Sequence, residues 1–227
     1  MAIGGGFGAG LLLGSAYFFG GALGLVGAAV ALPVLAFGIM TFISIPSGPA
    51  VLAQRILDNS ENITIAPDST GDCLDTGGNR IGPQTTLKQA AHDQPLTICS
   101  AGCKGKLVCT ANPAITLNPN LLNATKDMAA GGSSFRIESL VTGSHKANSW
   151  HYTGDAEDLI PPDHSPASFE KLRNFFADPA NAKHSNVDRA SCETQTGRFV
   201  GCLDKLKSGE RITHVHVQFK RGAQAPQ

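Results

Sequence analysis

The first 54 residues contain no Asp, Glu, Lys or Arg, so all 18 basic and all 18 acidic residues of the chain lie from Arg55 onward. Residues 4–45 are almost wholly apolar and are rich in Gly, Ala, Leu and Phe. A bilayer core takes about 20 apolar residues per helix, so this run is long enough for two spans. We expect a helical hairpin (residues 6–23 and 25–45) or, alternatively, one kinked span whose remainder lies along the interface.

A cleaved secretory signal is the less favoured interpretation of this segment. The run is too long, lacks a basic region at its start and shows no small-residue cleavage site before polar sequence begins. Residues 1–50 are therefore predicted to be a membrane segment, which ends at Pro46-Ser47-Gly48-Pro49.

The charge balance argues against nucleic acid as a partner. The formal net charge is zero and the sequence pI is about 7.0. Recruitment of nucleic acid depends on a basic field, and the sequence has no basic stripe to supply one. We therefore predict no nucleic-acid binding.

All the cysteines follow the apolar segment. An even number in that position favours three disulfides in an oxidising compartment, which places the polar part of the chain on the extracytoplasmic face. A structural zinc knot is the alternative, although the spacings lack the CxxC pairs usual in such sites. Cys192 and Cys202 are expected to pair with each other, and the other four allow three connectivities. The disulfide candidates are Cys73, Cys99, Cys103, Cys109, Cys192 and Cys202.

The polar part of the chain predicts an α+β fold, a small antiparallel sheet with flanking helices, preceded by the membrane segment. Residues 51–113 are interpreted as a linker, with a short helix, followed by a disulfide-stapled, loop-rich region. Residues 114–220 are interpreted as the compact domain, and 221–227 as a tail. Helices are predicted at 85–91, at 121–130 before Gly131-Gly132, and from Ser165-Pro166. Strands are predicted at 135–142, 156–160, 199–203 and 211–219.

Two short segments carry the ligand types of a transition metal. His151 and Asp158 lie seven positions apart, and His214 and His216 alternate on a run that reads as a strand, so both point to one face. Two imidazoles and one carboxylate, with a fourth position left to water, form the ligand set of a catalytic zinc hydrolase.

The first segment has the pattern Ser149-x-His151-x-x-Gly154-x-Ala156-x-Asp158. It resembles the signature of the zinc D-Ala-D-Ala peptidases, which share a fold with the hedgehog signalling domain. The resemblance implies zinc as cofactor and three ligands, His151, Asp158 and His216. It also implies that His214 lies beside the reacting carbonyl and that strand residue Arg136, with Ser149, serves substrate binding. A structural salt bridge is the alternative role for Arg136.

Two further positions resemble the hedgehog branch. His145 precedes His151 by six residues, and Glu210 precedes His216 by six, where that branch has an active-site histidine and a general base. Many peptidases of the family carry an acid three residues before the last ligand, where this chain has Thr213. Glu210 is therefore the predicted base, with Glu193 as the alternative if the segment between Cys192 and Cys202 folds over the cleft.

These patterns together predict a membrane-anchored zinc metallopeptidase that acts on peptidoglycan peptides. The prediction covers two types of peptidase, the D-Ala-D-Ala carboxypeptidase and the peptidoglycan endopeptidase. The competing prediction is a non-catalytic zinc-containing module that binds peptide or cell wall. Either one could be a subunit of a secretion, conjugation or phage apparatus, with other membrane-complex subunits as partners.

Overall fold

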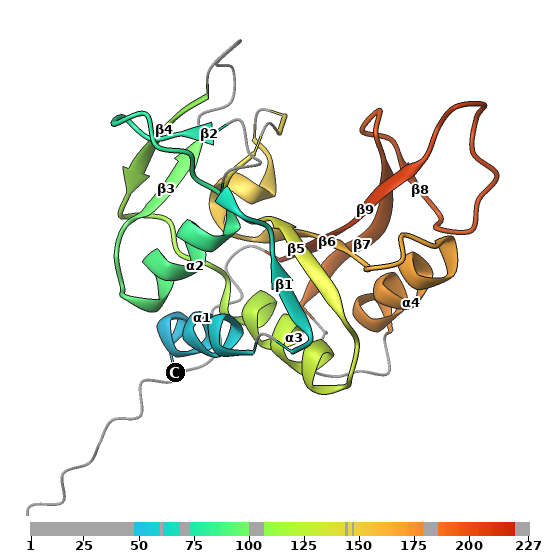
Figure 1. Cartoon of the computed structure of the whole chain (residues 1–227), viewed down its shortest axis with the longest axis horizontal. Coiled ribbons are helices and arrows are strands. Elements are labelled where there is room, and N and C mark those ends of the chain that lie inside the picture. The colour runs from blue at the N-terminus through green and yellow to red at the C-terminus, as the bar shows by residue number, and fades with distance from the viewer. Residues whose placement is uncertain are drawn as a thin grey trace, which may run out of the picture. The chain divides into compact units, whose positions relative to one another are not determined.

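The computed structural model describes residues 48–59, 61–68, 73–99, 107–143, 145–146, 148–178 and 186–220 (Figure 1). The predicted membrane segment falls almost entirely outside these ranges. Among the helices that the structure does describe, none combines the length and the apolar character needed to cross a bilayer.

A six-stranded sheet forms the centre of the described fold, and it is mixed rather than antiparallel as predicted. Its first two strands pair in parallel, and all its other pairs are antiparallel. The structure thus confirms the α+β class and corrects the sheet type. In spatial order the strands are β1 (Ile63–Ile65), β5 (Phe135–Ser139), β6 (Ala156–Ile160), β9 (Ile212–Phe219), β7 (Val187–Thr194) and β8 (Phe199–Val200).

Two strands of this sheet were not expected. β1 comes from the segment interpreted as a linker, and three residues are too few to show an alternating pattern. β7 joins β9 along most of its length, but its sequence VDRASCET alternates poorly because six of its eight residues are exposed or only partly buried. At the far edge, the strand predicted at 199–203 is reduced to the two residues of β8.

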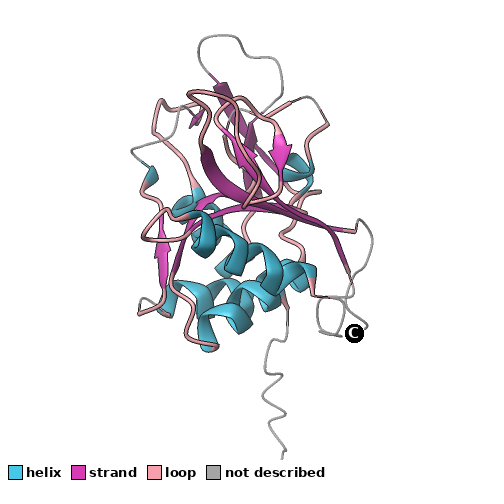
Figure 2. Cartoon of the chain, turned by 90° about the vertical axis from the view of Figure 1, so that its right-hand side faces the viewer, coloured by secondary structure: helices cyan, strands magenta, loops and turns pink. Residues whose placement is uncertain are grey.

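The helices gather on one side of the large sheet (Figure 2). Pro occupies the first turn of each, where its missing N–H costs no hydrogen bond. The predicted cap at Ser165 is confirmed, since its hydroxyl accepts from the Ser168 N–H, and the Asn118 side chain caps the preceding helix in the same way. The helices are α1 (Pro49–Asp58), α2 (Pro83–Ala91), α3 (Pro119–Ala130) and α4 (Pro166–Ala177).

The alternation of β9 separates the core from the opposite face. Val215, Val217 and Phe219 are fully buried beneath the helices. Successive side chains of a strand point to opposite faces, so His214 and His216 lie on the face away from the helices. The polar face of the sheet is therefore available for a site.

A second, three-stranded sheet has the order β2 (Cys73–Leu74), β4 (Leu107–Asn112) and β3 (Leu96–Cys99). Cys99 and Cys109 face each other across β3 and β4 and form a disulfide. The predicted Cys192–Cys202 disulfide is also present. Cys103, which any third pair would need, lies outside the described residues. Residues 73–99 and 107–112 thus contain more regular secondary structure than the predicted loop-rich region.

Gly154 is a position where the fold requires glycine. Its φ of +78° is left-handed, and a Cβ built on it would lie 2.1 Å from the carbonyl oxygen of Thr116. The Asn118 N–H donates to the Gly154 carbonyl, which holds the two segments together. The close approach sets the position of the turn that leads into β6.

We predict that Gly154→Ala lowers the free energy of unfolding by about 3 kcal/mol or more, because strain and a backbone clash act together. Gly132→Ala is the matched control: its φ is +77° but nothing lies within 4 Å of the added Cβ. It should cost only about 1 kcal/mol. Urea unfolding followed by the fluorescence of Trp150, the single tryptophan, measures both. Equal losses would contradict the steric role of Gly154.

Candidate metal centre

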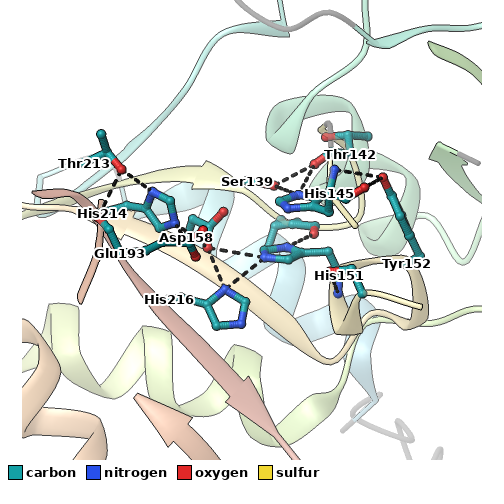
Figure 3. A network of polar contacts seen from close by, with 12 residues as sticks. Ser139, Thr142, His145, His151, Tyr152, Asp158, Glu193, Thr213, His214 and His216 are labelled. Atoms are coloured by element: carbon teal, nitrogen blue, oxygen red, sulfur yellow. Dashed lines mark hydrogen bonds and ion pairs between the residues drawn. The ribbon is translucent and has the colours of Figure 1, made fainter. Parts of the chain in front are cut away.

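The polar face of the large sheet brings the predicted metal ligands together (Figure 3). Asp158 on β6 is paired directly with His216 on β9. His151 comes from a separate element, the 3-10 helix η2 (Trp150–Thr153), whose first N–H groups are capped by the Ser149 hydroxyl. All three of these side chains are buried.

The donor atoms of these residues converge on one point. His151 Nε2 lies 3.2 Å from His216 Nδ1 and 3.3 Å from Asp158 Oδ1, and the last two atoms are 2.9 Å apart. Donors about 2.0–2.1 Å from a tetrahedral zinc ion are separated by about 3.3 Å. The triangle therefore has nearly the size that a zinc ion requires.

The surroundings of His151 orient its ring for this role. Its Nδ1–H donates to the Leu140 carbonyl at 2.5 Å, which turns Nε2 toward the other donors. A lone pair facing a buried carboxylate oxygen is unfavourable unless a proton or a cation lies between them. A carbonyl acceptor on the far nitrogen is also the usual support of a metal-binding histidine.

The buried carboxylate of Asp158 stays ionised. Burial alone would raise its pKa, but the adjacent His151 and His214 imidazoles and the hydrogen bonds from His151 and His216 hold the pKa well below its usual range. A buried anion ringed by imidazoles is a favourable position for a divalent cation. The residues present thus fit zinc in donor type, in spacing and in charge.

His145 lies against His151, one of the predicted ligands. The two rings are stacked with their centroids 3.8 Å apart and their planes 4° from parallel. His145 Nε2 lies 3.0 Å from the Ser139 hydroxyl and 3.2 Å from the Thr142 carbonyl. Burial lowers the pKa of His145 to about 4, with a smaller effect from the His151 imidazole, so the ring is neutral at neutral pH.

His214 lies beside the three ligands and faces two carboxylates. Its Nε2 is 3.4 Å from Asp158 Oδ1 and 3.3 Å from Glu193 Oε2, while its Nδ1 is 3.0 Å from the Thr213 hydroxyl. That hydroxyl donates to the Glu193 carbonyl, so it is an acceptor toward His214. Both ring nitrogens therefore have acceptors. Burial lowers the pKa of His214, but Asp158 and Glu193 outweigh burial and raise it above its ordinary value.

The carboxylate beside the cluster belongs to Glu193, not to the predicted base Glu210. Strand β7 places Glu193 directly opposite His214 on β9. Glu210 instead forms an ion pair with Arg198 and accepts hydrogen bonds from the Thr196 hydroxyl and the Lys207 N–H. The Arg198 guanidinium, with these hydrogen bonds, lowers the pKa of Glu210 to about 2. The structure thus places Glu193, the alternative base, beside His214. Glu210 lies against Arg198 instead.

The predicted substrate residues have other contacts in the structure. Arg136 pairs with Ile160 across β5 and β6, on the same face as Asp158, and forms an ion pair with Glu138 at 2.8 Å. Ser149 caps η2 through its hydroxyl, which accepts from the His151 N–H at 3.3 Å. Ser149 therefore supports the backbone of His151, one of the predicted ligands.

Tyr152 supports the site in a way that sequence reasoning missed. Its hydroxyl accepts from the His145 N–H at 3.0 Å and donates to the Gly143 carbonyl at 3.1 Å. Its ring packs with Cys73, Cys99 and Cys109, and Cys73 Sγ accepts from the Gly143 N–H. The position of Tyr152 next to His151 is the only sequence signal for this role.

Comparison with known protein families, curated proteins and solved structures finds no match to this chain. Its function must therefore be argued from the site itself. The strongest feature of that site is the convergence of His151, Asp158 and His216, which come from three separate segments.

We predict that the full chain in detergent binds one zinc ion per molecule. His151→Ala, Asp158→Ala and His216→Ala should each weaken zinc binding by at least about 100-fold, because each removes a ligand. His92→Ala, an exposed histidine at the end of α2, is the control and should leave zinc binding unchanged. Chelator-stripped protein titrated with zinc by calorimetry measures the affinities. Unchanged binding by Asp158→Ala would exclude this centre.

Proposed function

We propose that this chain is a zinc-dependent metallopeptidase, anchored to a membrane, that hydrolyses peptides of the cell wall. The single observation that supports it most is the donor triangle of His151, Asp158 and His216 with Glu193 and His214 directly beside it. This arrangement has the parts that metal-assisted hydrolysis needs: ligands, a base and a hydrogen-bond donor.

Zinc held by the three ligands would supply Lewis acidity, which polarises a carbonyl and lowers the pKa of water. Glu193 is the general base of the proposal: it takes a proton from the attacking water and returns it to the leaving amine. Its pKa lies below the usual value, since the hydrogen bond and charge of His214 outweigh its partial burial. It is therefore ionised and able to accept a proton at neutral pH.

His214 is the proposed donor to the oxyanion that develops on the scissile carbonyl. Its Nε2 lies between Asp158 and Glu193, so a proton on this nitrogen is held at the edge of the site. His145 keeps the His151 ring in place by stacking on it and is a positioning residue in this proposal. Arg136 is the candidate for binding a substrate carboxylate, which would compete with Glu138 for its guanidinium.

The proposed location rests on the apolar segment and on the disulfides. The described cysteines include the pairs Cys99–Cys109 and Cys192–Cys202, which persist in an oxidising compartment. A segment of residues 4–45 without charge would hold the domain at the membrane surface. The extracytoplasmic face is where peptidoglycan peptides are within reach.

A non-catalytic zinc module that binds peptide or cell wall is the second candidate. The observation in its favour is Thr213, which stands where many family members carry an acid and here donates to a backbone carbonyl. It is distinguished from the enzyme by turnover. A chain that binds zinc and cell-wall peptide without cleaving it would be such a module.

We expect Glu193→Gln to lower kcat/KM for a synthetic stem pentapeptide by roughly 100-fold or more, because it removes the base. Zinc affinity should change little, since Glu193 lies outside the donor triangle. Glu210→Gln is the matched control and should keep turnover within about threefold, because Glu210 contacts Arg198. Mass spectrometry of the products, with zinc content measured in parallel, gives the result.

Each outcome separates two interpretations. Loss of turnover in Glu210→Gln alone would return the role of base to Glu210 and contradict the assignment to Glu193. Zinc-loaded protein that cleaves neither stem pentapeptides nor purified peptidoglycan would remove the enzyme proposal and leave the binding module.

A further inference from the structure

We infer that Phe199 forms an apolar subsite next to the proposed metal centre. The peptides that bind at this centre carry an apolar side chain that contacts Phe199. The inference rests on the proposed function and extends it to the substrate. Phe199 does not belong to the motifs that resemble the zinc D-Ala-D-Ala peptidases. It is identified by its place in the sheet and by its contacts.

The strand register places Phe199 on the face of the site. Phe199 on β8 is paired with Glu193 on β7, and Glu193 is paired with His214 on β9. Residues directly opposite in antiparallel strands share a face, so these three side chains form one row across the sheet. The next residue, Val200, is buried in the core on the other face. The register therefore sets the Phe199 ring beside the proposed base.

The contacts of Phe199 join its ring to the metal centre. The ring centroid lies 5.5 Å from that of the ligand His216, and the two planes meet at 48°. The guanidinium of Arg189 lies over the ring, 4.8 Å from its centroid. These two contacts hold the ring at the border of the site, and the Cys192–Cys202 disulfide closes the hairpin that carries it.

Exposure distinguishes this ring from a core residue. Phe199 is 42 % exposed, and in the described part of the chain the other large exposed hydrophobic side chain is Leu203, at 66 %. Leu203 follows Cys202 in the turn after β8. An exposed hydrophobe alone means little, but one held against a metal ligand has both a fixed position and free apolar surface.

A ligand bound at the metal can cover this surface at low entropic cost. The ring is already held by His216 and Arg189, so little side-chain freedom is lost on binding. Covering apolar area is favourable in proportion to the area removed from water. A residue whose side chain is aliphatic or aromatic, or has a long aliphatic stem, should therefore bind better than glycine beside the scissile bond.

The test uses two metal-chelating probes, N-acetyl-leucine hydroxamate and N-acetyl-glycine hydroxamate, which bind without turnover. On the zinc-loaded full chain in detergent, calorimetry should show the leucine probe binding on the order of tenfold more tightly. Phe199→Ala should reduce this preference to about twofold or less, and Phe199→Tyr should retain it. Leu203→Ala is the matched control and should keep the full preference.

Three results would overturn the subsite. Equal binding of the two probes by the wild-type chain would do so, as would a preference that survives in Phe199→Ala or is lost in Leu203→Ala. Zinc content and the unfolding midpoint, measured on each variant, show whether a lost preference comes from a damaged centre. Protein that binds zinc but shows no preference contradicts this inference alone, whereas protein that binds no zinc contradicts the proposed function as well.

Discussion

The pairing of β6 with β9 is the constraint on which the site depends. It sets Asp158 opposite His216 and, through the same register, Leu159 opposite Val215. Leu159 and Val215 are fully buried against the helices, so the core resists a one-residue slip that would exchange the two faces of the strand. The apolar packing on one face thereby determines the position of the carboxylate and the imidazole on the other.

The third residue of the proposed ligand set is held by contacts outside the large sheet. His151 lies on a short 3-10 helix, and its ring is fixed by the Leu140 carbonyl on one side and by the stacked His145 on the other. Gly154, which follows this helix, packs closely against the Thr116 carbonyl. This close contact sets the position of the turn between the helix and β6. The donors converge because its contacts position His151, while the strand register positions Asp158 and His216.

Electrostatics explains why these polar groups tolerate burial. An isolated buried carboxylate is costly, yet Asp158 is surrounded by the nitrogens of His151, His214 and His216. The second carboxylate, Glu193, is only partly buried and contacts the outermost of these rings. This graded arrangement places one carboxylate among buried imidazoles and a second, partly exposed carboxylate at the edge of the cluster.

Much of the fold was open to prediction from local signals. The helix caps at Asn118 and Ser165 and the alternation in β5 and β9 are encoded within single elements. β1 and β7 were missed because neither a three-residue strand nor a strand with only two buried residues shows a clear period. The parallel pairing of β1 with β5 is a long-range contact, which no local pattern specifies.

The sequence by itself determined the donor set of the proposed centre, because the spacing of His151 and Asp158 and the alternation of His214 and His216 place donors within single segments. Tertiary structure alone decided which acid stands beside them. Glu210 is close to His214 in sequence but is tied to Arg198, whereas Glu193, twenty-one positions away, is brought opposite His214 by strand pairing. Contacts within one element follow from the spacing of residues along the sequence. Contacts between elements depend on how the elements pack around the core.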